Sequence, residues 1–364
     1  MSLVSLALRN IRLYERIHLE PSPHLNLFSG ANASGKTTLL EAIHLLGTGR
    51  SFRTAQTEQL RKNGSNDLSV TGNLVKADGE TTRLGLSLGI DGRRASINGL
   101  ETKQVSNLAR HLPLQVISPD THYEYQQSAK HRRGILDWGL FHVEPDFPGL
   151  WTRYQRILQQ RNAALKGRGQ NKARHVWDDE LVEYGEKLQA ARRLQTELLL
   201  PHFRRCCHAL LGETHEIDLA LDPGWDGQKE FGDSLYRDRE RDTARGFTHS
   251  GPHRADLLIV LNGQVSKLSA SHGQLKLLVV ALRLAQIRYL LESSGSGSGS
   301  GKGCCLLIDD LAAELDVVHR ARLTRYLASL TTQVFVTTTE SSLIDREYWP
   351  SHKTFHVEHG MVTS

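Results

Sequence analysis

The sequence has little cysteine and no long apolar run. Its four cysteines form two adjacent pairs, Cys206-Cys207 and Cys304-Cys305, which excludes the C-x-x-C spacing of a zinc site and a disulfide framework. They predict buried thiols in a reducing compartment. Nowhere do about 18 apolar residues follow one another, so no membrane-spanning helix is expected. Arginines interrupt the N-terminal segment, which lacks a signal-peptide core, and we expect a cytoplasmic protein that has no membrane partner.

What the sequence does contain is enough apolar material for a core and a small excess of basic charge. Its 364 residues exceed the usual size of one domain and favour two lobes. Hydrophobic residues make up 39%, which excludes wholesale disorder. The 45 basic residues outnumber the 40 acidic ones and give a net charge of +5. That balance suits a polyanionic partner without requiring one.

Strand patterns at both ends of the chain enclose a helical middle. Alternating apolar residues predict strands within 3–28 and a β meander over 68–100, and helical periodicity runs from about 128 to 214. Prolines 145, 148 and 201 are expected to break that helical region. Further elements are predicted as helices over 37–46, 275–291 and 319–330 and as strands over 257–261, 265–268, 304–308 and 333–336.

This order predicts an α/β fold with one mainly parallel sheet assembled from both termini. The helical middle is then an insertion. We expect an N-terminal part of lobe one over 1–112, a helical lobe two over 113–246 and a C-terminal part of lobe one over 247–364. The Gly/Ser-rich stretch 293–301 is expected to be a flexible loop between a helix and the next strand.

The segment from Gly30 to Thr37, which reads GANASGKT, fits the phosphate-binding pattern G-x-x-x-x-G-K-[ST]. An apolar strand precedes it and an amphipathic helix follows, as that loop requires. Its glycines let backbone N–H groups surround phosphates at the positive end of the helix. Lys36 would neutralise the β- and γ-phosphate oxygens, and the Thr37 hydroxyl would bind Mg²⁺. The alternative is an ordinary glycine turn into a helix.

An apolar strand, Cys304–Ile308, ends in two carboxylates. Asp309 at the strand end can hold the hydrated Mg²⁺ of an ATP complex. Asp310 is then positioned to polarise an attacking water. Taken alone, the pattern is also that of a strand ending at a helix cap.

A second anion-binding pattern precedes the predicted helix over 275–291. Ser271, Gly273 and Gln274 place a hydroxyl and a glycine N–H at a helix start. The phosphate-binding loop already serves the nucleotide of one chain. A second such turn therefore suggests a nucleotide site completed by another subunit, whereas a plain helix cap is the alternative.

The order of these motifs resembles the ABC-type ATPase heads of the SMC and Rad50 class, and within that class the RecF family. The segments that carry the resemblance are Leu8–Arg12, Asn26–Gly30, Gly134–Asp137, Gln160–Leu165, Gly251–Arg254, Gly273–Leu278 and Ala313–Asp316. The resemblance implies an ABC-ATPase head with a P-loop sheet, a β meander and an inserted helical lobe without a long coiled coil. It also implies ATP and Mg²⁺ as cofactors.

Several residue roles follow from the resemblance alone. It implies that Asn32 senses the γ-phosphate, that Gln115 links lobe two to the metal, and that Asp316 crosses a dimer. Thr338 would replace the usual switch histidine. The nucleotide-contacting residues implied are Gly30, Ala31, Asn32, Ala33, Ser34, Gly35, Lys36, Thr37 and Thr38, with Ser271, Gly273, Gln274 and Asp316 from the partner.

Two departures from the family pattern carry expectations. Asp310 stands where many ABC heads have glutamate, and its shorter reach predicts slow hydrolysis. Ala33 stands where many have glycine, which requires a negative φ at this position. Arg50 and Arg53 follow the P-loop helix, where the class often places an arginine near phosphate or DNA, although a solvated loop pair is equally compatible.

A basic segment lies within the helical region. Residues 151–175 carry seven Arg or Lys and no Asp or Glu. Such a segment can hold DNA through its phosphates, or it can be a solvated helix face. The candidate DNA-binding residues are Arg50, Arg53, Arg153, Arg156, Arg161, Lys166 and Arg168.

The function implied by the resemblance is recombination and repair of DNA. Two ATP-bound copies would form a homodimeric clamp on gaps or junctions between single- and double-stranded DNA, and slow hydrolysis would release it. RecR and RecO mediators would be partners in loading the RecA recombinase. Two alternatives are an ATPase subunit of a membrane transporter and a cohesin-like structural head, the latter needing far longer heptad repeats.

Overall fold

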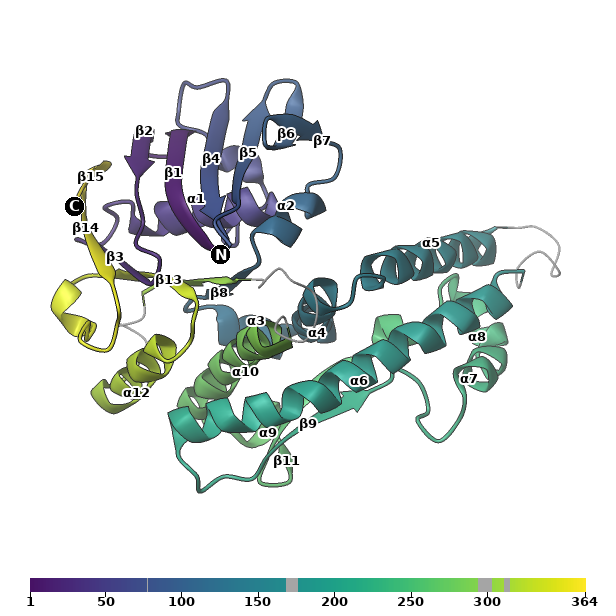
Figure 1. The fold of residues 1–364 in the computed structure, drawn as a ribbon. Coiled ribbons are helices and arrows are strands. Elements are labelled where there is room, and N and C mark those ends of the chain that lie inside the picture. Colours follow the sequence, from purple (N-terminus) through teal and green to yellow (C-terminus); the bar gives the residue numbers. More distant parts are fainter. Residues whose placement is uncertain (77, 168–175, 294–302, 311–314) are drawn as a thin grey trace. The chain divides into compact units, whose positions relative to one another are not determined.

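The computed structural model describes all residues except 77, 168–175, 294–302 and 311–314, and it divides the chain into two units (Figure 1). Unit 1 comprises Met1–Thr121 and Leu290–Ser364, and unit 2 comprises His122–Tyr289. Most of the Gly/Ser-rich stretch, Arg168, Ala313 and Glu314 lie outside the described residues.

Unit 1 contains a six-stranded, mainly parallel sheet in the order β15-β14-β3-β13-β12-β8. Only β15 runs antiparallel to its neighbour. The central strands are buried on both faces, as their uninterrupted apolar sequences predict. The strands are β3 (Leu25–Ser29), β8 (Leu114–Ile117), β12 (Cys305–Ile308), β13 (Gln333–Thr338), β14 (His352–Glu358) and β15 (Met361–Thr363). The predicted assembly of one sheet from both ends of the chain is therefore confirmed.

A second, antiparallel sheet in unit 1 has the order β2-β1-β4-β5-β6-β7. Asn98 and Gly99 both have positive φ in the turn between β6 and β7, as a two-residue hairpin requires. The strands are β1 (Ser2–Ile11), β2 (Tyr14–Leu19), β4 (Leu68–Val75), β5 (Thr81–Gly89), β6 (Gly92–Ile97) and β7 (Leu100–Thr102). The predicted meander over 68–100 is present.

Helix α1 (Lys36–Thr48) packs against strands of both sheets. A helix that contacts a sheet on each side needs apolar residues all around, and its five leucine and isoleucine side chains are fully buried. Together with the facing strands they form the main apolar cluster of unit 1. The shorter helices of this unit are η1 (Thr57–Leu60), α2 (Ser106–His111), α12 (Val317–Ala328) and η4 (Ser341–Leu343).

Unit 2 is mainly helical and also contains a three-stranded antiparallel sheet. Its core lies where α5 (Phe147–Lys166) packs on α6 (Asp178–Leu211), around Tyr154, Leu188 and Phe231. The other elements are α3 (Thr121–Gln127), α4 (Ala129–Val143), α7 (Phe231–Arg237), α8 (Arg239–Arg245), η3 (Pro252–Arg254), α9 (Ser266–Ser269), α10 (His272–Ser293), β9 (Ile217–Asp222), β10 (Asp256–Leu261) and β11 (Gln264–Val265).

The division between the units differs from the expected boundaries at 112/113 and 246/247. It falls at 121/122 and 289/290. Strand β8 pairs with β12 and therefore belongs to unit 1, whereas β10 pairs with β9 and belongs to unit 2. These are long-range pairings that local sequence patterns do not specify.

Two predictions about the secondary structure are wrong. Pro201 does not break the helical region but lies inside the 34-residue helix α6, where buried Leu199 and Phe203 anchor the helix on both sides of it. Residues 266–269 form helix α9 rather than a strand. Among the described residues, no helix combines the length and the apolar composition needed to cross a bilayer.

Candidate functional site

Three strands of the parallel sheet end at the same edge of unit 1. Register places Thr338 of β13 opposite Ser29 of β3, and Ile308 of β12 opposite Val336 of β13. The glycine-rich loop follows Ser29 directly and Asp309 follows Ile308, so this edge gathers both predicted halves of the nucleotide site. Ligand sites of open α/β sheets characteristically form at such carboxyl ends.

Glycine is required at both ends of the loop. Gly30 has φ +153°, and a Cβ there would lie 2.2 Å from the carbonyl oxygen of Val357. Gly35 has φ +114°, and a Cβ there would lie 2.6 Å from the Tyr14 hydroxyl oxygen, which itself donates a hydrogen bond to the Gly35 carbonyl. The loop backbone is thus pressed between β14 and β2, which fixes its shape.

Ala33 has φ +64°, so the expectation of a negative φ is wrong. An L-residue in this left-handed region costs about 1–2 kcal/mol. The exposed side chain of Ala33 faces the cavity beside the loop. The close contacts of Gly30 and Gly35 keep the backbone of Ala33 in this strained conformation.

The Lys36 ammonium group folds back onto the loop. Its Nζ donates to the carbonyl oxygens of Gly30, at 2.7 Å, and Ala31, at 2.8 Å. Burial lowers the pKa of Lys36, and the nearby carboxylates of Asp310 and Asp309 oppose that shift. The ammonium group of Lys36 therefore lies on the loop where a phosphate would bind. Its two carbonyl acceptors are neutral, and an anion can replace them.

The Asp309 carboxylate joins three segments of the chain. Its Oδ1 accepts hydrogen bonds from the hydroxyl of Thr37, at 2.9 Å, and from that of Thr337, at 2.7 Å. Hydroxyl and carboxylate oxygens are the donors that Mg²⁺ prefers. The residues present therefore fit a Mg²⁺ ion that is completed by phosphate oxygens and water. Among the described residues, no group of three or more His, Cys, Asp or Glu could hold a metal without a nucleotide.

Thr337 was missed by the sequence reasoning, which selected its neighbour. The Thr337 hydroxyl also accepts from the backbone N–H of Asp310 at 2.8 Å and lines the cavity. Thr338 is fully buried and donates to the carbonyl oxygen of Glu340, so it does not take the place of a switch histidine. The three consecutive threonines 337–339 were the available signal, and the pleat of β13 decides between them.

Gln115 does not reach the site. It pairs with Leu306 within the sheet, is buried, and is not among the residues around the cavity. The predicted link from Gln115 to the metal is therefore wrong, because the residue lies before the sheet edge at which Asp309 is found. Asp310 does line the cavity and has φ +52°.

A cavity of about 870 Å³ opens beside the loop, large enough for a nucleotide. Two arginines that line the cavity are paired with a single buried carboxylate. Glu41 of α1 is fully buried and pairs with Arg12, at 3.0 Å, and Arg53, at 3.7 Å. The cavity is lined by Arg12, Leu13, Asn32, Ala33, Gly35, Lys36, Thr37, Thr38, Arg53, Gln59, Arg61, Lys62, Asn63, Asp309, Asp310 and Thr337.

Two arginines after the P-loop helix were predicted to lie near phosphate or DNA. Arg53 lines the cavity, whereas Arg50 is exposed and is not among the residues that line it. Arg12 was missed, although it lies within the segment Leu8–Arg12 that carries the family resemblance. Arg12 has φ +47°, a conformation that turns its side chain toward Glu41. The cavity therefore presents four arginine and lysine side chains besides Lys36: Arg12, Arg53, Arg61 and Lys62.

The turn of Ser271, Gly273 and Gln274 lies at the start of α10 in unit 2. Gln274 N–H donates to the Ser271 hydroxyl at 3.3 Å, and Ser271 N–H donates to the Gln274 side chain at 3.0 Å, which is a reciprocal cap. A Cβ at Gly273 would meet nothing within 4 Å. Within unit 2, neither a positive φ nor a close neighbour requires glycine there. Asp316 of unit 1 is an exposed helix cap that accepts from His319, and these hydrogen bonds lower the pKa of Asp316.

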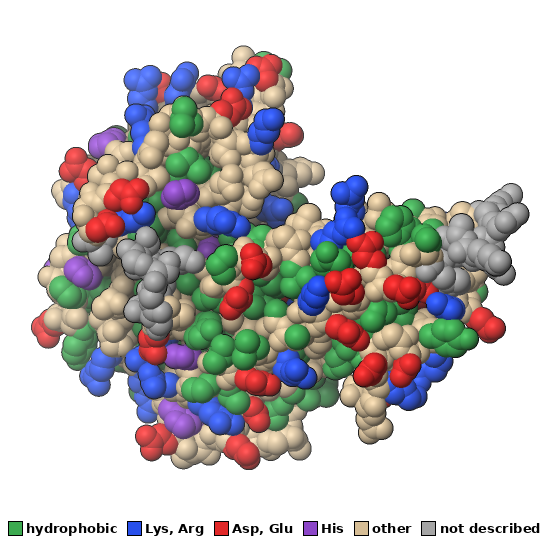
Figure 2. All heavy atoms as spheres, turned by 45° about the vertical axis from the view of Figure 1, so that its right-hand side comes forward, with side chains coloured by type: hydrophobic (Ala, Val, Ile, Leu, Met, Phe, Trp, Pro, Cys, Tyr) green, Lys and Arg blue, Asp and Glu red, His purple; other side chains and the backbone are tan. Residues whose placement is uncertain are grey.

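The predicted DNA-binding residues of α5 separate into two groups. Arg153, Arg156 and Lys166 are exposed, although Arg153 pairs with Glu180 of α6. On the face shown in Figure 2, basic and acidic side chains are mixed rather than gathered in one basic stripe. Arg161 is fully buried, so its predicted contact with DNA is wrong.

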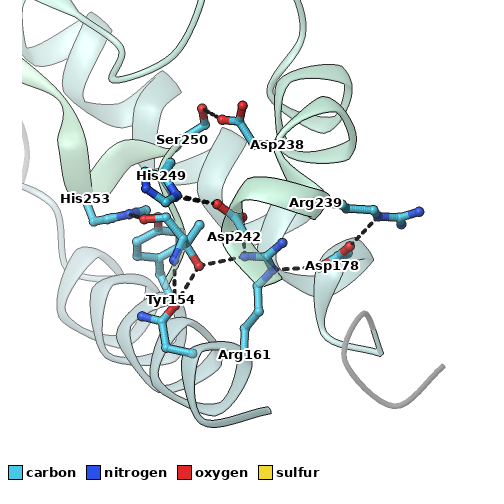
Figure 3. Close-up of polar contacts among 11 residues, drawn as sticks. Tyr154, Arg161, Asp178, Asp238, Arg239, Asp242, His249, Ser250 and His253 are labelled. Atoms are coloured by element: carbon cyan, nitrogen blue, oxygen red, sulfur yellow. Dashed lines mark hydrogen bonds and ion pairs between the residues drawn. The ribbon is translucent and has the colours of Figure 1, made fainter. Parts of the chain in front are cut away.

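Arg161 is the centre of a buried polar network (Figure 3). Its guanidinium donates to Asp178 and to Asp242, both at 2.7 Å, and to the Thr248 hydroxyl at 2.8 Å. Asp242 also accepts from His249 at 2.7 Å. The network ties α5 to the start of α6, to α8 and to the segment after α8, which explains an arginine inside the core.

Comparison with known proteins gives a consistent likeness. The family model of the RecF/RecN/SMC N-terminal domain matches residues 2–363. The DNA replication and repair protein RecF of Thioalkalivibrio sulfidiphilus is 39% identical over 363 residues, covering 100% of this chain and 99% of that protein. RecF of Vibrio campbellii is 38% identical with both chains covered fully. The structure of the recombination mediator RecF with ATP has a TM-score of 0.86 at 26% identity, covering 100% of this chain and 97% of that one.

The strain at Ala33 predicts a gain in stability on Ala33→Gly. Relief of about 1–2 kcal/mol should exceed the entropic cost of glycine, about 0.5–1 kcal/mol, so the free energy of unfolding should rise by about 0.5–1 kcal/mol. Ala31→Gly is the matched control, because Ala31 is also exposed but lacks a positive φ, and it should lower that free energy. Urea unfolding measures both; a loss of stability in Ala33→Gly would contradict the assignment of strain.

The buried network predicts a large effect of Arg161→Met. Removing the guanidinium takes a shared partner from the buried carboxylates of Asp178 and Asp242, which keep Arg239 and His249 respectively, and this should cost about 3–5 kcal/mol. The exposed Arg153→Met on the same helix should cost less than about 1 kcal/mol. Chemical denaturation of both variants checks this, and equal effects would show that the network does not stabilise unit 2.

Proposed function

The chain belongs to the RecF family of DNA replication and repair proteins, and we propose that two ATP-bound copies close into a clamp on DNA, which slow ATP hydrolysis opens. Its fold is that of an ABC-type ATPase head. The proposal rests on the different groups that the two units contain. Unit 1 holds a complete set of groups for phosphate and metal, while unit 2 presents a capped helix start at which Gly273 has open space in front of it.

We infer that ATP occupies the cavity of unit 1 with its triphosphate along the glycine-rich loop. Lys36 would exchange its two carbonyl partners for phosphate oxygens. Arg12 and Arg53, both paired with Glu41, would add positive charge to the cavity lining. Arg12 donates a hydrogen bond to the fully buried Glu41 at 3.1 Å, so the orientation of its guanidinium group is set before the nucleotide arrives.

In this proposal Thr37 and Asp309 hold the Mg²⁺ that accompanies ATP. The ion would neutralise charge that develops on the phosphate oxygens. Asp310 would orient the attacking water, and its backbone is fixed by the hydrogen bond to Thr337. The short aspartate side chain, in a left-handed backbone conformation, supports slow turnover, which suits a switch.

The turn of Ser271, Gly273 and Gln274 would bind the triphosphate of the second copy. A helix start offers unpaired backbone N–H groups and a positive dipole end, and glycine permits close approach of a partner chain. Exposed Leu268 beside this turn, and Val317 and Val318 beside Asp316, are apolar groups that a dimer interface would cover. Each closed dimer would then contain two equivalent sites made from both copies.

DNA would be held through phosphates by exposed basic side chains, among them Arg50, Arg153, Arg156 and Lys166. One solved relative is described as the recombination mediator of the RecFOR pathway. By that likeness we propose RecR and RecO as partners, the loading of RecA as the outcome, gapped or junction DNA as the substrate and the cytoplasm as the location.

Mixing two inactive variants tests whether the sites are shared. Lys36→Ala disables the P-loop and Ser271→Arg disables the partner turn, so each homodimer lacks both sites. In a mixed dimer one site combines both defects and the other contains neither. An equal mixture should therefore recover about a quarter of the wild-type ATPase, since about half of the dimers are mixed and each has one intact site.

The control is a mixture of Lys36→Ala with a second P-loop variant, Thr37→Ala, in which no intact site can form and activity should stay at background. Absence of recovery in the first mixture, although sedimentation shows mixed dimers, would refute the shared site. Nucleotide binding by the Ser271→Arg monomer should be retained, because its own P-loop is intact.

The proposed DNA-binding role of α5 predicts a change in salt dependence. Joint reversal of Arg153, Arg156 and Lys166 to glutamate should weaken binding to gapped DNA. It should also reduce the slope of log affinity against log salt by about 0.9 for each phosphate that the protein no longer neutralises. Reversal of Arg193, Arg204 and Arg205 on α6, which are also exposed, is the control of equal charge. Equal effects of the two triple variants would remove α5 from the DNA site.

A further inference from the structure

Two histidine rings meet at the Ser271–Gln274 turn, within unit 2. His272 is exposed between Ser271 and Gly273, and His122, near the start of α3, is 3% exposed. Their Nε2 atoms are 2.9 Å apart and their rings are nearly perpendicular, at 88°. This is hydrogen-bond distance and geometry. The imidazole of His122 therefore holds the Ser271–Gln274 turn through its hydrogen bond to His272, within unit 2.

Only one hydrogen atom fits between two nitrogens at this distance. One ring donates an N–H and the other must offer an unprotonated nitrogen, so the bonded pair contains at most one imidazolium. If both rings become charged, two N–H groups and two positive charges face each other and the hydrogen bond breaks. The hydrogen bond therefore survives the first protonation of the pair and is lost only when both rings are charged.

We propose that His122 is a positioning residue for the Ser271–Gln274 turn and that its hydrogen bond to His272 makes ATP-driven dimerisation sensitive to protons. The inference rests on the proposed role of this turn in binding the partner's ATP. The separated rings take up more protons than the bonded pair. The hydrogen bond is therefore present in the neutral and in the singly protonated pair, and it breaks on acidification when the second ring also gains a proton.

The neighbouring charges delay the loss of the hydrogen bond on acidification. On α3 the adjacent side chains are Tyr123, whose ring lies 4.0 Å from His122 and 5.3 Å from His272 between centroids, and Glu124. On α10, Lys276 follows His272 by one turn, and Arg283 interacts with Glu124. On α9, Lys267 pairs with Asp256. A lysine one turn away and an acid already engaged by an arginine both disfavour a second proton on the pair.

The test compares four full-length proteins, the wild type and three variants, by sedimentation with ATP and Mg²⁺ between pH 7.5 and 5.0. Wild-type dimerisation should weaken toward the acid end, by up to about tenfold per pH unit where the pair takes up its second proton. His122→Gln, which can still donate to His272 but cannot become charged, should dimerise with less than half of that pH dependence on a logarithmic scale. His122→Phe keeps a ring without a hydrogen bond and should weaken dimerisation at every pH. His208→Gln, an exposed histidine of α6, is the control and should follow the wild type.

Identical pH profiles for wild type and His122→Gln would overturn the proposal. A second measurement separates this failure from failure of the proposed function. Nitrogen NMR of the histidine rings, on the chain without nucleotide and with EDTA to exclude bridging metals, should show a shared hydrogen bond that disappears on acidification. If the wild type never dimerises, the shared ATP site fails; if the two rings titrate independently, the histidine pair fails whatever the dimer does.

Discussion

One carboxylate oxygen organises the nucleotide site. Asp309 Oδ1 accepts the hydroxyls of Thr37, at the start of α1, and Thr337, on β13, so three segments far apart in the sequence share one acceptor. The hydroxyl of Thr337 in turn fixes the backbone of Asp310. These side chains, whose oxygens fit a Mg²⁺ ion, are therefore already held by hydrogen bonds. The same holds for Lys36, which already lies on the loop carbonyls.

The central features of the site could be read from the sequence because they are local. A glycine-rich loop between an apolar strand and a helix, and an apolar strand that ends in two aspartates, each specify their geometry within a dozen residues. The parallel sheet followed from the same strands. Their meeting at one edge needed only the rule that parallel strands end on the same side.

What the sequence could not supply depends on contacts between distant segments. The choice between Thr337 and Thr338 is made by the pleat of β13, and Gln115 is excluded by the register of β8. Arg161 reads as one more basic residue of an exposed helix, whereas Asp242 and Thr248, far along the chain, draw it into the core. Pro201 is tolerated inside α6 because burial on both sides of it outweighs a local preference. In each case tertiary packing overrides the local signal.

The loop glycine that abuts Val357 has a consequence for how the protein is made. The P-loop emerges early from the ribosome, but the two strands that flank β3, β13 and β14, lie in the last part of the chain. During synthesis strand β3 and the P-loop therefore lack both neighbouring strands of the sheet until β13 and β14 have been made. The sheet that carries the loop is therefore completed only when translation is nearly finished.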